Sequence, residues 1–198
     1  MNIPFQFGRI AMGDNFIDRN QELQRLKQNF ASLTNTILIS PRRWGKSSLV
    51  ALAAQQIQKE NKKIKVCQID FYQARTPNEF YEILITGLLN ATNTKLDEFV
   101  QRSKEMFKSL LPKFSFGSLS GEQISIGFEW NDIKKSQDQL LDLAESIAIS
   151  KNLKLIIAID EFQNIAEFSD GVSFQKRLRQ FGKNINMSPI AYPVLNVI

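Results

Sequence analysis

The most informative segment of the chain covers residues 37–48 and reads Ile-Leu-Ile-Ser-Pro-Arg-Arg-Trp-Gly-Lys-Ser-Ser. Its apolar start, residues 37–39, enters a polar turn that ends in Gly45-Lys46-Ser47 and leads into a helix-forming run, residues 49–58. Phosphate-binding loops have this order of buried strand, tight turn and helix N-terminus. Unpaired N–H groups and the helix dipole at that end attract an anion. The stretch therefore predicts a Walker A loop.

Each residue type in the turn suits a part of nucleotide binding. Gly45 lets the backbone approach the phosphates, Lys46 reaches the β- and γ-phosphates, and the Ser47 hydroxyl holds Mg²⁺. The usual pattern is G-x-x-x-x-G-K-[ST], but its first glycine position is Ser40 here. Gly-Lys-Ser alone is weak evidence, so a second motif is needed. The other residues expected to bind the nucleotide from this loop are Pro41, Arg42, Arg43, Trp44 and Ser48.

The second motif is the apolar run of residues 153–159, which ends in Asp160 and Glu161. Such a run is typical of a parallel strand buried on both faces, and ligands bind outside the carboxyl ends of such strands. We expect this strand to neighbour the Walker A strand, with Asp160 as the Walker B carboxylate on the Mg²⁺ side. Glu161 suits the residue that orients and deprotonates the attacking water. The alternative is a strand that ends in two solvated acids.

Composition limits the class of protein. The 198 residues are 43% hydrophobic and 23% charged, as expected for one compact domain. The net charge of +5 is spread along the chain, which permits contact with nucleic acid without requiring it. A single cysteine, Cys67, gives no disulfide framework and indicates a cytoplasmic protein. The sequence has no histidine, which argues against zinc sites and histidine catalysis, and no run long enough for a membrane span.

Helix-start signals occur at two further places. Asp18 followed by Gln21 predicts a capped helix that buries Leu23, Leu26 and Phe30. Thr76-Pro77-Asn78-Glu79 predicts a second start, with Thr76 as the cap and Pro77 at the first helical position. Further elements are expected as a strand over residues 64–71 and as helices over about 95–111, 138–150 and 172–181.

A hairpin pattern interrupts this alternation of strands and helices. Residues 113–129 alternate apolar and small or polar side chains about a Ser-Gly turn, so residues 112–130 are predicted to be a β-hairpin insertion. The hairpin could contact a protein partner or DNA, but covering a sheet edge or part of the core is the favoured interpretation. Likewise, Lys176, Arg177 and Arg179 could serve a subunit interface or an acidic partner, although a solvated basic face is favoured.

Taken together, the chain resembles the AAA-type P-loop ATPases of the STAND and archaeal-ATPase group. The segments that carry the resemblance are residues 2–8, 16–19, 40–48 and 160–163. Members of this group also replace the first glycine and read Pro-Arg-Arg-Trp/Tyr-Gly-Lys-Ser, so Ser40 supports the resemblance. It implies binding of ATP and Mg²⁺, hydrolysis of ATP, and a contribution of residues 16–19, with Asp18 and Arg19, to the adenine pocket.

The resemblance also implies a fold and a domain plan. The fold is an α/β P-loop NTPase, with three layers (α/β/α), a mainly parallel sheet and the hairpin as an insertion. Residues 1–182 would form the ATPase domain, with residues 1–30 as an adenine-side segment and helix. Residues 183–198 form an atypical tail, with Pro189 and Pro193 where the family has a central strand. The tail predicts a truncated or frameshifted chain that lacks its sensor strand, lid and winged-helix region.

Two classes of function follow. The first is an ATPase whose turnover drives a larger assembly, and which could self-associate. The second is a nucleotide-dependent switch that contacts DNA or a protein partner and hydrolyses little ATP. Glu161 favours hydrolysis, because a pure binding switch needs no water-activating base.

Overall fold

The main sheet of the computed structural model contains four parallel strands. The residues that the structure describes are 19–41, 44–95, 98, 101, 113–119, 123–129, 144–168, 171–176 and 194–197. The strands are β1 (Ile37–Leu38), β2 (Ile64–Asp70), β5 (Lys154–Asp160) and β6 (Val194–Val197). Their order in the sheet is β1-β6-β5-β2, and each neighbouring pair is parallel.

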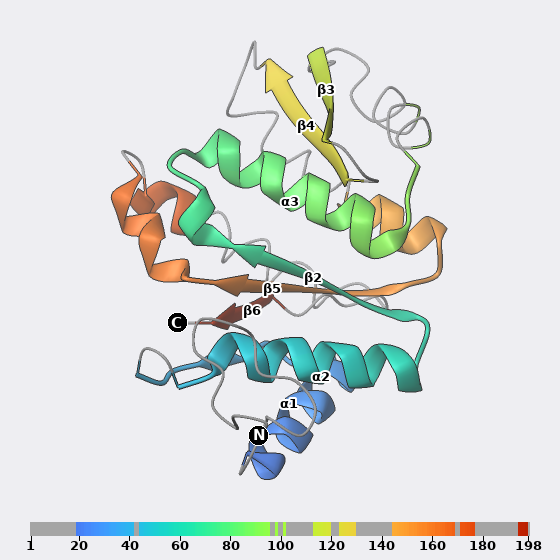
Figure 1. Cartoon of the computed structure of the whole chain (residues 1–198), viewed down its shortest axis with the longest axis vertical. Helices are drawn as coiled ribbons and strands as arrows, with labels where there is room; N and C mark the ends of the chain where they lie inside the picture. Colours follow the sequence, from blue (N-terminus) through green and yellow to red (C-terminus); the bar gives the residue numbers. More distant parts are fainter. Residues whose placement is uncertain are drawn as a thin grey trace, which may run out of the picture.

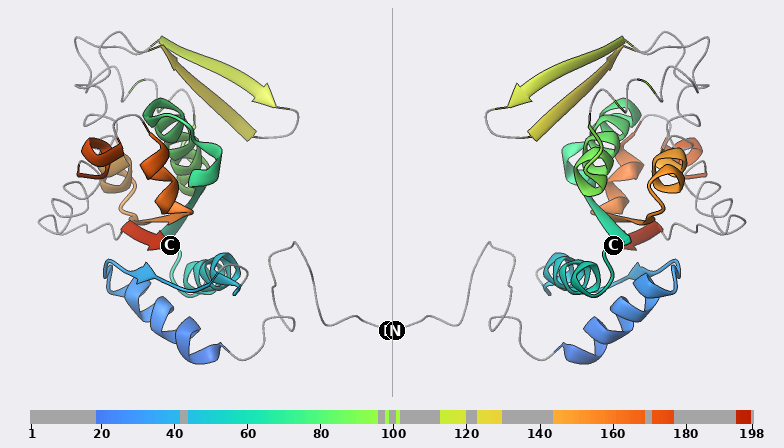
Figure 2. Two further views of the ribbon diagram at one scale, coloured as in Figure 1. Left: turned by 90° about the vertical axis from the view of Figure 1, so that its left-hand side faces the viewer. Right: turned by 90° about the vertical axis from the view of Figure 1, so that its right-hand side faces the viewer.

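Helices cover both faces of this sheet (Figures 1 and 2). On one face lie α1 (Asn20–Ala31) and α2 (Lys46–Glu60). On the other lie α3 (Pro77–Thr92) and the helical residues 144–150 and 171–176. Two short 3-10 helices, η2 (Phe71–Gln73) and η3 (Phe162–Glu167), follow the ends of β2 and β5. The fold is therefore α/β with a small parallel sheet.

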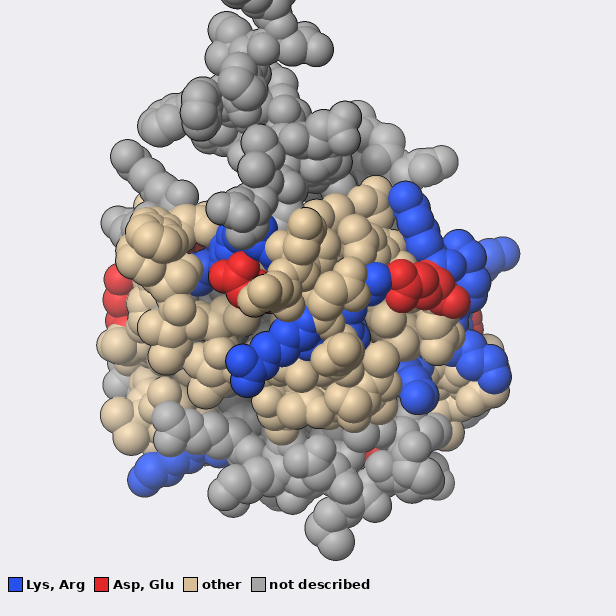
Figure 3. All heavy atoms as spheres, turned by 90° about the horizontal axis from the view of Figure 1, so that it is seen from below, with Lys and Arg blue, Asp and Glu red and all other residues tan. Residues whose placement is uncertain are grey.

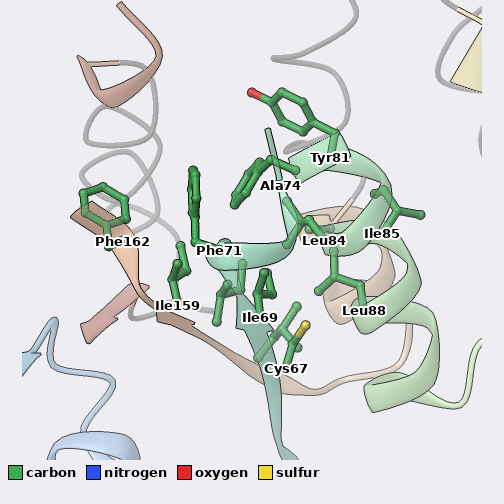
Figure 4. Packing of buried hydrophobic residues seen from close by; sticks show 14 of the residues in the cluster. Cys67, Ile69, Phe71, Ala74, Tyr81, Leu84, Ile85, Leu88, Ile159 and Phe162 are labelled. Atoms are coloured by element: carbon green, nitrogen blue, oxygen red, sulfur yellow. The ribbon is translucent and has the colours of Figure 1, made fainter. Parts of the chain in front are cut away.

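The alternation of side chains along β2 and β5 divides the core in two. In β5, Leu155, Ile157 and Ile159 pack on the α3 side, whereas Ile156 and Ala158 pack on the α2 side. Because the period along a strand is two, the next even-numbered position, Asp160, belongs to the α2 face. The α3-side core is rich in aromatic rings, Phe71 among them (Figure 4). The ring centroids of Phe71 and Phe80 are 5.1 Å apart.

The α3 helix begins as its sequence predicts. Thr76 is the N-cap, its side-chain oxygen accepts the Glu79 N–H at 3.2 Å, and Pro77 is the first helical residue. The Glu79 carboxylate accepts the Arg75 N–H at 2.7 Å. These two bonds satisfy backbone donors that a helix start leaves unpaired.

The start of α1 differs from the prediction. Arg19, and not Asp18, occupies the N-cap position, and no side chain caps the helix there. The Arg19 carbonyl accepts the Leu23 N–H at 3.0 Å, which is the first turn of the helix. The expected buried face is present, since Leu23, Leu26 and Phe30 are all buried. Asp18 itself lies outside the described residues.

Two further strands form a separate antiparallel pair. These are β3 (Lys113–Leu119) and β4 (Gln123–Glu129), in a register that joins Lys113 to Glu129. The pair lies beyond α3, with β4 in contact with that helix (Figures 1 and 2). The pair therefore lies on the side of α3 that faces away from the main sheet (Figure 1). Neither strand of the pair is hydrogen-bonded to a strand of the main sheet.

Two expectations about the main sheet are wrong. The Walker A strand β1 is not a neighbour of β5, because β6 lies between them. The tail does supply a central strand, since Val194–Val197 pairs with both β1 and β5. Pro189 and Pro193 both precede this strand, so neither interrupts its ladder.

Candidate functional site

The predicted Walker A loop joins β1 to α2. Gly45 is the N-cap of α2 and has a φ of 72°, a left-handed conformation that favours glycine. The loop tightens ahead of it, where the Trp44 N–H donates to the Pro41 carbonyl at 3.4 Å. The first helical bond runs from the Leu49 N–H to the Gly45 carbonyl at 2.9 Å. The first turn of α2 therefore begins directly after a glycine.

The Lys46 side chain folds back over this loop. Its Nζ donates to the Ser40 carbonyl at 3.1 Å, so the first and last parts of the loop are joined by a cation. The Ser40 hydroxyl oxygen is buried and has no hydrogen-bond partner. Ser40, which replaces the usual first glycine, is thus in contact with the Lys46 ammonium group, the group that is expected to reach a phosphate.

The two motifs meet through one hydrogen bond. The Ser47 hydroxyl donates to Oδ2 of Asp160, 113 residues further along the chain. Oδ1 of the same carboxylate accepts the Glu161 N–H at 2.9 Å. Asp160 is therefore held by both oxygens, one toward the start of α2 and one toward its own strand end. A hydroxyl and a carboxylate are the hard oxygen ligands that Mg²⁺ prefers.

Glu161 occupies an unusual backbone conformation. Its φ of 54° lies in the left-handed region, which costs a non-glycine residue about 1 kcal/mol or more. Its carboxylate accepts a hydrogen bond from the Gln163 side-chain amide. This conformation turns the chain sharply after β5, before η3 begins. The Glu161 side chain is thus held at the carboxyl end of the sheet by a neighbour in its own turn.

A cavity of about 370 Å³ adjoins this pair of motifs. Asp70 and Asp160 are directly opposite each other in the β2–β5 register, so both end their strands beside the cavity. Because they continue the same alternation, both belong to the face of the sheet that α2 covers. The cavity is lined by Ser47, Val50, Gln68, Ile69, Asp70, Gln73, Ile83, Ala158 and Asp160.

The remaining residues predicted for the site occupy different surroundings. Ser48 is buried, with 7% of its surface exposed, whereas Trp44 is 66% exposed beside the loop. Arg19 reaches the loop from the start of α1, where it contacts the Trp44 carbonyl. Pro41 is exposed at the loop surface. Asp18, Arg42 and Arg43 lie outside the described residues.

Sequence reasoning missed two polar residues near the motifs. Asp70 ends a strand in the same way as Asp160, and this shared feature is a signal that could have identified it. Gln163 lies in the segment 160–163 that carries the family resemblance, but the sequence assigns it no role of its own. In the described part of the chain, no group of three or more His, Cys, Asp and Glu side chains could hold a metal ion.

Comparison with known proteins agrees with this geometry. The family described as Predicted AAA-ATPase matches residues 6–184, which include the predicted Walker A loop, Asp160 and Glu161. The chain belongs to this AAA-ATPase family. The AAA-type resemblance expected from the motifs is therefore confirmed. The match ends before β6, and a search of curated proteins found none that matches.

Solved structures of archaeal proteins share the fold of this AAA-ATPase chain. The ORC2 protein of Aeropyrum pernix, in ADPNP and ADP complexes, gives a TM-score of 0.59 at 14% identity, over 98% of this chain and 43% of that one. The ORC1 protein of the same organism, in complex with DNA, gives 0.56 at 12% identity, over 95% and 41%.

A third similar structure is the Walker-type ATPase PABY2304 of Pyrococcus abyssi. Its TM-score is 0.51 at 22% identity, over 98% of this chain and 49% of that one. At these identities the likeness concerns the fold alone. The AAA-ATPase chain spans less than half the length of each of these three proteins.

The surface of the AAA-ATPase chain near α1 and α2 is mixed in charge. Figure 3 shows basic and acidic side chains interspersed with neutral surface on this face. One such pair joins Lys27 of α1 to Glu60 of α2 at 2.6 Å. Among the described residues, no helix has the length and apolar character to cross a membrane.

Proposed function

We propose that this chain is the ATP-binding core of an AAA-type ATPase that hydrolyses ATP with Mg²⁺. In this proposal the Walker A loop, Ser40 to Ser47, binds the phosphates. Asp160 and Glu161 form the Walker B site. The observation that carries the proposal is the hydrogen bond from the Ser47 hydroxyl to the Asp160 carboxylate. It joins the two halves of the site, which are far apart in the sequence.

The Ser47 hydroxyl and the Asp160 carboxylate are the groups that would hold Mg²⁺. They supply few ligands by themselves, which suits an ion that is usually bound by one or two protein groups, waters and substrate phosphates. When bound, the ion would neutralise charge on the β- and γ-phosphates. Lys46 would leave the Ser40 carbonyl and donate to those same phosphates, adding a positioned positive charge.

Glu161 is proposed to act on the attacking water. A carboxylate at the carboxyl end of β5 can accept a proton from water as that water attacks the γ-phosphate, and the bond from the γ-phosphorus to the bridging oxygen breaks. The products are ADP and inorganic phosphate. The hydrogen bond from Gln163 and the left-handed turn at Glu161 support a defined direction for this carboxylate.

The first experiment measures ATP binding and phosphate release by the purified chain with Mg²⁺. We expect Lys46→Ala to weaken ATP binding roughly ten- to hundredfold, because it removes charge-assisted bonds to phosphate. We expect Glu161→Gln to keep ATP bound and to abolish turnover. Unchanged ATP affinity in Lys46→Ala would show that this loop is not the phosphate site.

The second candidate function is a nucleotide-dependent switch with little hydrolysis. It is favoured by the position of the β3–β4 pair, which lies on the outer side of α3, where a partner protein or DNA could reach it. Slow phosphate release that is unaffected by Glu161→Gln would favour the switch. Fast release that is lost in Glu161→Gln would favour the ATPase.

A further inference from the structure

The Arg19 guanidinium links the start of α1 to the Walker A loop. Its Nη1 donates to the Trp44 carbonyl at 2.7 Å, across 25 residues of sequence. Its Nε and Nη2 both lie 3.2 Å from Oε1 of Glu22, one turn along α1. One edge of the guanidinium is therefore held by Glu22, and the other holds the loop.

The Trp44 carbonyl and the Gly45 N–H belong to the same peptide unit of the loop, so the direction of one sets the direction of the other. In a planar trans peptide, the carbonyl of one residue and the N–H of the next point in opposite directions. Fixing the Trp44 carbonyl toward Arg19 therefore directs the Gly45 N–H away from Arg19. Gly45 is the N-cap of α2, so its N–H lies at the N-terminus of that helix. Such N–H groups bind phosphates at a helix N-terminus.

We propose that Arg19 is a positioning residue for the phosphate cradle, acting through the Trp44 carbonyl, and that Glu22 orients it. The proposal rests on the proposed function of the loop as a nucleotide site. It gives Arg19 a different task from the adenine contact that the family resemblance implies. It also makes the beginning of α1 part of the phosphate site, so that this helix and the loop are ordered together.

The contacts suit positioning better than stabilisation of the fold. The Arg19 and Glu22 side chains are 23% and 54% exposed, and ion pairs of this kind contribute little to the free energy of unfolding. Arginine presents donors in a rigid fork, so it can serve Glu22 and Trp44 at the same time. The ammonium group of a lysine lacks this fork. A positioning role therefore depends on the side-chain shape as well as its charge.

The test compares ATP with inorganic tripolyphosphate, which has the phosphates but no base or ribose. Binding of each is measured by titration calorimetry for the wild-type chain and for Arg19→Gln, Arg19→Lys and Glu22→Gln. We expect Arg19→Gln to weaken both ligands by a similar factor of about ten, as the loss of a charge-assisted hydrogen bond would. We expect Glu22→Gln to weaken both by less, and Arg19→Lys to recover only part of the loss.

Control variants separate positioning by Arg19 from a contact with the base, from a general effect of charge and from a loss of folding. Arg25→Gln removes a positive charge from an exposed site on the same helix, and should leave both affinities unchanged. Equal unfolding midpoints for the variants and the wild type would exclude a general loss of structure. Loss of affinity for ATP alone would assign Arg19 to the base or ribose and overturn the proposal. Full recovery in Arg19→Lys would also overturn it, because charge alone would suffice.

The outcomes also distinguish this proposal from the proposed function. If the wild-type chain bound neither ligand, the nucleotide site itself would be wrong, and the role of Arg19 with it. If the wild type bound both ligands and Arg19→Gln bound them equally well, only the positioning role would be wrong.

Discussion

At the scale of single residues, the site depends on carboxylates whose directions are set by close neighbours. Asp160 accepts hydrogen bonds on both oxygens, from the Ser47 hydroxyl and the Glu161 N–H. Glu161 has one partner in the described contacts of its side chain, the Gln163 amide. A carboxylate held by one neutral hydrogen bond can reorient when that bond is lost. The direction of Glu161 is therefore the more easily perturbed of the two.

We predict that Gln163→Leu lowers the rate of ATP hydrolysis and leaves ATP affinity unchanged. The substitution removes the donor that holds Glu161, and we expect kcat to fall by roughly three- to tenfold, the contribution of one hydrogen bond. Steady-state phosphate release and a separate binding titration would measure the two effects. Glu167→Gln, at the other end of η3, is the matched control and should behave as the wild type. An unchanged kcat in Gln163→Leu would contradict this prediction.

Cys67 makes stability depend on pH in the alkaline range. Burial among apolar side chains raises the pKa of the Cys67 thiol from 9.0 to about 12. The folded state therefore keeps its proton while the unfolded state loses it above pH 9. The stability that the neutral thiol contributes is fully present below pH 9 and is lost as the pH rises toward 12.

We predict that the wild-type chain loses stability relative to Cys67→Ala above pH 9, by about 1 kcal/mol per pH unit. Urea unfolding of both chains from pH 7 to 10.5 would measure the difference in their free energies of unfolding. Lysine and tyrosine titrate in both chains, so their effects cancel in this difference. Parallel pH profiles above pH 9 would show that Cys67 ionises equally in both states.

At the scale of elements, α3 packs against β2 with a glycine facing a cysteine. A Cβ built on Gly87 of α3 would lie 2.7 Å from Cys67 Sγ, which is closer than real side chains approach. Cys67 belongs to the α3-side core (Figure 4). The glycine is therefore present for close packing, although glycine inside a helix lowers its intrinsic stability.

We predict that Gly87→Ala destabilises the chain by about 1–3 kcal/mol, despite the higher helix propensity of alanine. In a Cys67→Ala background the sulfur is gone, so the same change should be neutral or stabilising. A double-mutant cycle by urea unfolding would measure the coupling between the two sites. Additive effects would mean that the contact between Gly87 and Cys67 does not limit the packing.

At the scale of the whole molecule, β6 decides whether the two motifs share one sheet. Asn196 pairs with Ile37 of β1 on one side and with Ile159 of β5 on the other. These pairings are the connection, within the described sheet, between the strand that leads to Ser40 and the strand that ends at Asp160. Loss of β6 would thus remove the strand that joins β1 to β5, and with it the link through the sheet between the predicted Walker A loop and Asp160.

We predict that Asn196→Pro lowers the free energy of unfolding by about 3 kcal/mol or more and weakens ATP binding. Proline lacks a backbone N–H, and a central strand needs its N–H groups for the hydrogen bonds to its neighbouring strands. Asn196→Val keeps the N–H and serves as the control for the side chain. Urea unfolding and ATP titration of both variants would test this. Full ATP affinity in a stable Asn196→Pro chain would mean that β6 does not join the two motifs.

Local parts of this structure followed from the sequence, because each depends on near neighbours along the chain. Gly45 begins α2 because glycine tolerates a positive φ before a helix. Thr76 begins α3 because its hydroxyl reaches an N–H three residues on. The apolar run ending at Asp160 becomes a strand buried on both faces. The start of α1 was misplaced by one residue, since Arg19 and not Asp18 is its N-cap.

The tertiary structure alone decided which distant residues meet. Only the folded sheet places β6 between β1 and β5, since strand order depends on long-range pairing that spacing along the chain does not encode. Spacing along the chain likewise does not predict that Asp70 lies opposite Asp160, or that Arg19 donates to the Trp44 carbonyl. The motifs, and most of the helices and strands that carry them, can be read from local patterns along the chain. The motifs come together only when the strands pair in one sheet and the helices pack on its two faces.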